Sequence, residues 1–136
     1  MYPAELVKPM REHLTQVGFE ELHTAEAVDT ALANSGTTLI VVNSVCGCAA
    51  ANARPGAIIS LENDKRPTQT VTVFAGVDKD AVAKARDYMV PFPPSSPCMA
   101  LFKDGELVHM LERHHIEGRP AELIAENLMN AYNEHC

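Results

Sequence analysis

Apolar residues along this chain follow two periods, and short apolar runs alternate with stretches of helical spacing. Residues 37–43 form a near-continuous apolar run of strand length, which is typical of a central strand covered on both faces. Near the C-terminal end, Lys103-Asp104-Gly105-Glu106 separates two further apolar runs, and its Asp-Gly pair predicts a hairpin. The predicted strands are residues 19–22, 37–43, 70–75, 99–102 and 107–111.

Helical spacing of apolar residues predicts a helix before the first strand and others between the later ones. Pro3 is suited to the first position of the first helix, whereas Pro9 predicts that this helix is kinked or short. Thr24 is a good N-cap for the second helix, and Pro55-Gly56 predicts a bend in the third. The later helices are predicted at residues 24–33, 48–62, 79–89 and 120–132. This order predicts an α/β fold with a central mixed sheet flanked by helices.

Size and charge narrow the class of protein. A chain of 136 residues predicts a single domain spanning residues 1–136, and its net charge of -7 argues against nucleic-acid binding. No stretch approaches the roughly 20 apolar residues of a membrane span, and residues 1–6 lack the features of a secretory signal. We therefore expect a cytoplasmic protein without membrane partners, whose four cysteines serve catalysis or metal binding rather than a disulfide framework.

Cys46-Gly47-Cys48 lies where the strand at 37–43 gives way to an alanine-rich helix. Free N–H groups and the dipole at a helix start favour an anion, so this position predicts a lowered thiol pKa. Residues two apart on a regular helix point to different sides, so a disulfide here requires Cys46 outside helical geometry, with Gly47 supplying backbone freedom. The small ring predicts a reducible, exchange-prone disulfide.

Several short motifs occur in a characteristic order along the chain. They are Asn43-Ser44-Val45-Cys46-Gly47-Cys48-Ala49-Ala50, Ala53-Arg54-Pro55-Gly56, Pro93-Pro94-Ser95-Ser96-Pro97, the opening Met1-Tyr2-Pro3, Ile116-Glu117-Gly118-Arg119 and the C-terminal Cys136. With these motifs in this order, the chain resembles the bacilliredoxin family over essentially its whole length. The resemblance implies a thioredoxin-like α/β fold with an added N-terminal helix.

The resemblance also implies an activity and its residues. Bacilliredoxins are thiol–disulfide oxidoreductases that remove a low-molecular-weight thiol, bacillithiol, from protein mixed disulfides, and some are described as disulfide isomerases. By position, Cys46 would attack, Cys48 would resolve, and Pro97 would be the cis-proline that borders the site. The implied partners are protein mixed disulfides, a small thiol and a separate reductant, with no cofactor. Residues 37–43 contain no acid and the chain has no tryptophan, unlike thioredoxin, so general disulfide reductase activity is not expected.

Cys98 leaves an alternative open. It directly follows Pro97 and would therefore lie close to the C-G-C motif, either as a small core residue or as a third reactive thiol. Three thiolates from Cys46, Cys48 and Cys98 are also suitable ligands for Zn²⁺ or an iron–sulfur cluster. The alternative function is thus a thiolate metal or cluster-binding protein, and a further one is an interaction module without redox activity.

Other chemically capable side chains have simpler interpretations. His109, His114 and His115 are potential ligands, but a solvated strand end is the preferred interpretation. Arg54 and Arg119 could bind a carboxylate of a small thiol, although surface ion pairs are the preferred interpretation.

Overall fold

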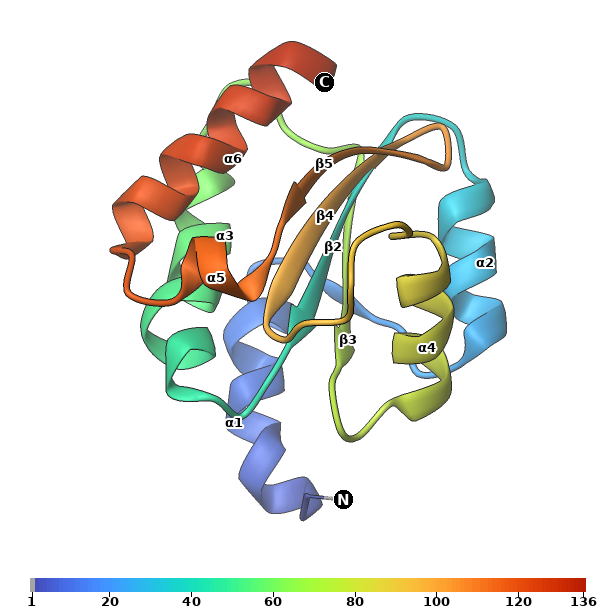
Figure 1. Ribbon diagram of the computed structural model, residues 1–136, viewed down its shortest axis with the longest axis vertical. Helices are drawn as coiled ribbons and strands as arrows, with labels where there is room; N and C mark the ends of the chain where they lie inside the picture. Colours follow the sequence, from blue (N-terminus) through green and yellow to red (C-terminus); the bar gives the residue numbers. More distant parts are fainter. Residues whose placement is uncertain (1) are drawn as a thin grey trace.

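The computed structural model describes residues 2–136 and shows a central sheet with helices on both sides (Figure 1). Its elements are α1 (Ala4–Thr15), β1 (Glu20–Glu21), α2 (Ala25–Ala33), β2 (Thr37–Asn43), the π-helix η1 (Ala49–Ala53), α3 (Arg54–Ser60), β3 (Gln69–Phe74), α4 (Lys79–Asp87), β4 (Cys98–Lys103), β5 (Glu106–Leu111), α5 (Arg113–Ile116) and α6 (Ala121–His135). The predicted class, a mixed sheet flanked by helices with an added N-terminal helix, is confirmed.

The five strands are arranged in the order β1-β3-β2-β4-β5. β3 pairs in parallel with β1 and β2, whereas β2 with β4 and β4 with β5 are antiparallel. Because β2 and β4 run in opposite directions, the end of β2 and the start of β4 lie at the same edge, where Val42 pairs with Cys98. The chain segments before β4 and after β2 are thereby brought together.

Two hydrophobic clusters cover the two faces of the sheet. Ile40 and Val42 of β2 pack with α2 and α4, while Leu39 and Val41 pack with α1, α3 and α6. All seven residues of β2 are buried, as expected for a strand covered on both faces. Figure 1 shows α2 and α4 together on one side of the sheet and α3, α5 and α6 on the other.

Proline and glycine produce the main differences from the predicted elements. α1 continues through Pro9 as one helix of 12 residues, so Pro9 does not end it; Asn43 Nδ2 donates to the Met10 carbonyl and fastens this helix to the sheet. The irregularity in this helical segment comes before Pro55-Gly56 and is the π-helix η1, where Arg54 N–H donates to the carbonyl of Ala49. Because Pro55 has no N–H, it cannot donate to the ladder of η1, and it lies instead in the first turn of α3, which ends at Ser60.

The hairpin between β4 and β5 has the predicted turn. Asp104 and Gly105 have φ values of 51° and 83°, the positive values that a two-residue type I′ turn requires at both positions. The four-residue helix α5 was not predicted. None of the helices formed by residues 2–136 is both long and apolar enough to span a membrane.

Candidate active site

The C-G-C motif forms the start of the helical segment that follows β2. The Cys46 carbonyl accepts hydrogen bonds from the N–H groups of Ala49 (3.0 Å) and Ala50 (3.3 Å), so the first helical turn begins at Cys46. Cys46 is half-buried, Gly47 is exposed and Cys48 is buried. The structure thus places both thiols at a helix start, as the sequence predicted.

The two thiols interact directly and have opposite pKa shifts. The pKa of Cys46 is lowered by a hydrogen bond from the Cys48 thiol, and further by the Cys48 N–H, whose nitrogen lies 3.4 Å from Cys46 Sγ, and by the charge of Arg113. The pKa of Cys48 is raised by burial, by its hydrogen bond to Cys46 and by the negative charge that develops there. Cys46 is therefore the thiol of the pair that ionises first.

Arg113 is a site residue that the sequence did not suggest. Its backbone N–H donates to Ser95 Oγ (3.3 Å) and its Nη1 donates to the Ser96 carbonyl (3.2 Å), so α5 begins against the segment that precedes Pro97. The charge of Arg113 lowers the pKa of both active-site thiols. No local pattern predicted α5, and only the fold brings Arg113 to the cysteines.

The Arg54 side chain is buried rather than at the surface, and it binds the residues that lead into the C-G-C motif. Its Nη1 donates to Asn43 Oδ1 (2.9 Å) and to the Ser44 carbonyl (3.1 Å), and its Nε donates to His13 Nδ1 (3.1 Å). The Ser44 hydroxyl in turn accepts the N–H of Cys46 at 3.1 Å. The expected surface ion pair of Arg54 is therefore wrong, since its guanidinium holds the chain at the end of β2.

A cis peptide bond joins Ser96 to Pro97, as the resemblance implied, and Pro97 is buried. Cys98 is 0% exposed and belongs to the cluster on the α2 and α4 face, whereas Cys46 and Cys48 open the helical segment on the other face. Burial raises the pKa of the Cys98 thiol to about 11. Cys98 is therefore a core residue, and the expected group of three neighbouring thiols is not formed.

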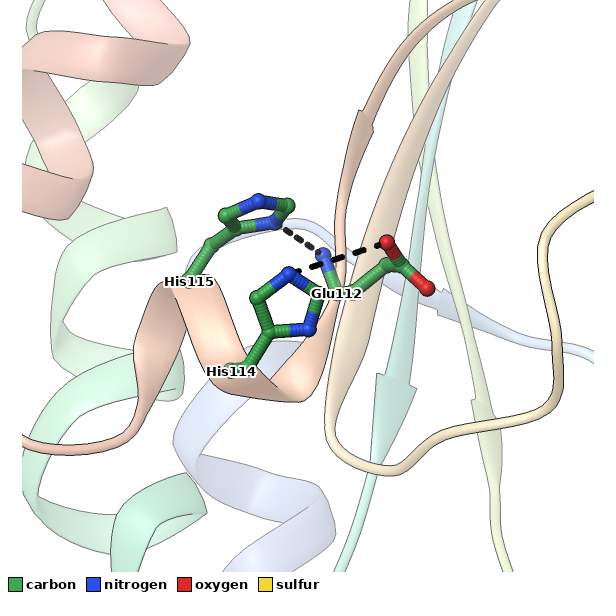
Figure 2. Close-up of side chains that lie close together, drawn as sticks. All are labelled: Glu112, His114 and His115. Atoms are coloured by element: carbon green, nitrogen blue, oxygen red, sulfur yellow. Dashed lines mark hydrogen bonds and ion pairs between the residues drawn. The ribbon is translucent and has the colours of Figure 1, made fainter.

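Glu112, His114 and His115 form a group of potential metal ligands whose donor atoms lie within 4.8 Å of one another (Figure 2). Within residues 2–136 it is the one such group of three or more residues. His115 Nδ1 already accepts the Glu112 N–H at 3.0 Å, and the Glu112 side chain completes this capping box at the start of α5. His109 of β5 lies apart from this group and hydrogen-bonds through Nε2 to Asn127 Oδ1 of α6 (2.7 Å). The predicted solvated strand end is wrong for His114 and His115, because both lie in the helix α5. His115 closes the capping box, whereas His114 and Arg119 are exposed.

Comparisons with known proteins agree with this geometry. The family model described as disulphide isomerase matches residues 2–136. A bacilliredoxin of Cytophaga hutchinsonii is 59% identical over 134 residues, covering 98% of this chain and 99% of the relative. A bacilliredoxin of Halalkalibacterium halodurans is 55% identical over 136 residues, covering 99% and 94%.

Solved structures show the same fold at low sequence identity. Thioredoxin of Fasciola hepatica superimposes with a TM-score of 0.58 at 16% identity, covering 87% of this chain and all of the other. Mitochondrial thioredoxin 3 of Saccharomyces cerevisiae gives a TM-score of 0.58 at 14% identity, covering 85% and 94%. The chain therefore belongs to the bacilliredoxin family of thioredoxin-fold proteins and is a thiol–disulfide oxidoreductase.

Proposed function

We propose that this protein removes a low-molecular-weight thiol of the bacillithiol type from protein mixed disulfides in the cytoplasm, with residues 1–136 acting as one domain. The observation that carries the proposal is the contact between Cys46 and Cys48 at a helix start. The Cys48 nitrogen lies 3.4 Å from Cys46 Sγ, and the pKa is lowered at Cys46 and raised at Cys48. The names of its bacilliredoxin relatives support the choice of substrate.

The first step is attack of the Cys46 thiolate on the small-thiol sulfur of a mixed disulfide. A disulfide forms between Cys46 and the small thiol, the original S–S bond breaks, and the client protein leaves as a thiolate that takes up a proton from water. No net oxidation occurs, because one disulfide replaces another. The half-exposed position of Cys46 supports access of a client sulfur to it.

The second step is attack of Cys48 on the Cys46 sulfur, which releases the small thiol and closes the Cys46–Cys48 disulfide. Two causes of the raised pKa of Cys48, its hydrogen bond to Cys46 and the Cys46 charge, disappear once Cys46 carries the adduct. Cys48 therefore becomes easier to deprotonate at the stage when it is needed. A separate thiol reductant must then supply two electrons and two protons to reopen the ring.

The same chemistry supports disulfide isomerase activity. When Cys46 attacks a disulfide within a client protein, the freed client thiol can attack a different sulfur before Cys48 resolves the complex. Burial of Cys48 supports this course because it raises the pKa of the resolving thiol and so lowers the fraction present as thiolate. Pro97 and Gly47 would border the client in either reaction.

Mass spectrometry of the Cys48→Ala variant tests the proposal. After challenge with a client protein carrying a small thiol, this variant should retain the small thiol as a stable adduct on Cys46. The wild-type protein should instead lose two hydrogens as the ring closes, and Cys46→Ala should do neither. Cys98→Ala is a matched cysteine control and should behave as wild type. An unmodified mass for Cys48→Ala would contradict the mechanism.

A further inference from the structure

We infer that Arg113 is a specificity-determining residue that favours mixed disulfides whose small thiol carries a carboxylate. This inference rests on the proposed function and names the substrate class that the same site would select.

Hydrogen bonds fix the start of α5 against the segment before Pro97. Arg113 N–H donates to Ser95 Oγ at 3.3 Å, and Arg113 Nη1 donates to the Ser96 carbonyl at 3.2 Å. Arg86 Nη1 donates to the Ser95 carbonyl at 2.9 Å and holds the same segment from α4. The guanidinium of Arg113 is therefore presented from an anchored backbone rather than from a free surface loop.

Arg113 is also held near the C-G-C motif. Its partner Ser96 lies two residues before Cys98, and Cys98 pairs with Val42 at the end of β2, four residues before Cys46. The charge of Arg113 lowers the pKa of Cys46 and of Cys48, while the carboxylate of Glu117 acts in the opposite direction on Cys48. Arg54, the other arginine at the site, is buried and bonded to the chain that leads into the motif. Of these two arginines, only Arg113 is exposed enough to bind a small molecule from solution.

The present carboxylate partner of Arg113 can be replaced. Glu117 Oε2 lies 2.9 Å from Arg113 Nη2 and 3.3 Å from Nε, and the side chains of Arg113 and Glu117 are 44% and 60% exposed. An exposed pair of this kind is weak, because water screens it. When the small thiol is bonded to Cys46, its carboxylate would replace Glu117 as the acceptor for Nε and Nη2 of Arg113.

The selection operates in the exchange already described, without another redox step. The Cys46 thiolate attacks the small-thiol sulfur, the client thiolate leaves, and the adduct's carboxylate is then held beside Arg113. A neutral small thiol undergoes the same bond changes but gains no such contact. A cationic small thiol is repelled by Arg113.

One client protein loaded with three different small thiols tests this inference. The probes are 3-mercaptopropionate (anionic), 2-mercaptoethanol (neutral) and cysteamine (cationic), and the measurement is the second-order rate of client release. Wild type should react in that order of decreasing rate. Arg113→Gln should lower the ratio of anionic to neutral rates by about two- to fivefold, and Glu117→Gln should raise it.

Controls separate selection from thiol activation. Loss of Arg113 also raises the pKa of Cys46, but that change affects all three substrates equally and cancels in the rate ratio. Arg113→Lys should keep part of the ratio, and Arg66→Gln, a change of the same charge at an exposed position after α3, should leave it unchanged.

Two results lead to different conclusions. If Arg113→Gln slows all three substrates by the same factor, Arg113 only activates Cys46 and the inference is overturned. If wild-type protein exchanges with none of the three, the proposed function itself fails.

Discussion

Replacing Arg54 with methionine tests whether a buried cation organises the active-site segment. Arg54 is 4% exposed, and none of its hydrogen-bond partners in residues 2–136 is a carboxylate. Methionine keeps much of the length and apolar volume of arginine but removes every donor. The change therefore removes the hydrogen bonds and leaves the packing of the α3 start largely intact.

The expected loss in the free energy of unfolding combines the loss of three hydrogen bonds with the relief of a buried charge. Arg54 donates to Asn43 Oδ1, to the Ser44 carbonyl and to His13 Nδ1 at 2.9–3.1 Å. Each bond to a charged donor contributes about 1.5–3 kcal/mol. Without Arg54 the buried Ser44 carbonyl loses this donor, whereas Asn43 Oδ1 still accepts the Ser44 N–H. Methionine avoids the cost of burying a guanidinium, which also lowers the pKa of Arg54. We expect a net loss of about 2–4 kcal/mol in the free energy of unfolding.

Urea unfolding of the reduced proteins measures this loss as a lower midpoint at unchanged slope. Arg66→Met, at an exposed position, is the matched control and should change stability by less than about 0.5 kcal/mol. A difference of that small size for Arg54→Met would refute the reasoning.

Three further predictions concern the thiols and the glycines. Iodoacetamide should alkylate Cys46 with a pH midpoint below 9.0, since the thiolate is the reactive form. Cys48→Ala should raise that midpoint, because it removes the hydrogen bond from the Cys48 thiol, and an unchanged midpoint would contradict the pairing. Cys98 should resist alkylation in the folded protein, and Cys98→Ala should cost about 1 kcal/mol without changing the exchange rate. Gly56→Ala places a Cβ 2.6 Å from the Ile124 side chain of α6, so it should lower the free energy of unfolding in urea by about 1–3 kcal/mol. Gly47→Ala meets no atom within 4 Å and should lower it by less than about 0.5 kcal/mol.

Most of the fold could be predicted because its signals are local. The strand at Thr37–Asn43 was located from an apolar run that reflects burial on both faces, and the hairpin from Asp104-Gly105, which accept positive φ. α5 was missed because four residues are too few to show helical periodicity. Its capping box also places histidine, rather than the usual glutamate or glutamine, at the third helical position.

The site was predictable only where its chemistry lies within one segment. Cys46 and Cys48 follow from their position between a strand and a helix, but the roles of Arg54 and Cys98 depend on tertiary structure. Arginine is rarely buried without a partner, so its sequence context indicated a surface position. Cys98 follows Pro97, yet strand alternation turns its side chain to the face opposite the C-G-C helix. Sequence proximity to Pro97 could not reveal that direction.

The two arginines at this site have separate roles: Arg54 stabilises the fold, whereas Arg113 affects the reactivity of the thiols. A double variant tests this separation. Arg54 binds Asn43, Ser44 and His13, whereas Arg113 binds the segment before Pro97 and Glu117, so they share no hydrogen-bond partner. Arg113→Gln should leave the urea midpoint unchanged and slow exchange, because its exposed contacts add little to folding. The double variant with Arg54→Met should therefore unfold at the midpoint of Arg54→Met alone. A further drop in that midpoint would mean that Arg113 supports the folded active-site segment as well as its chemistry.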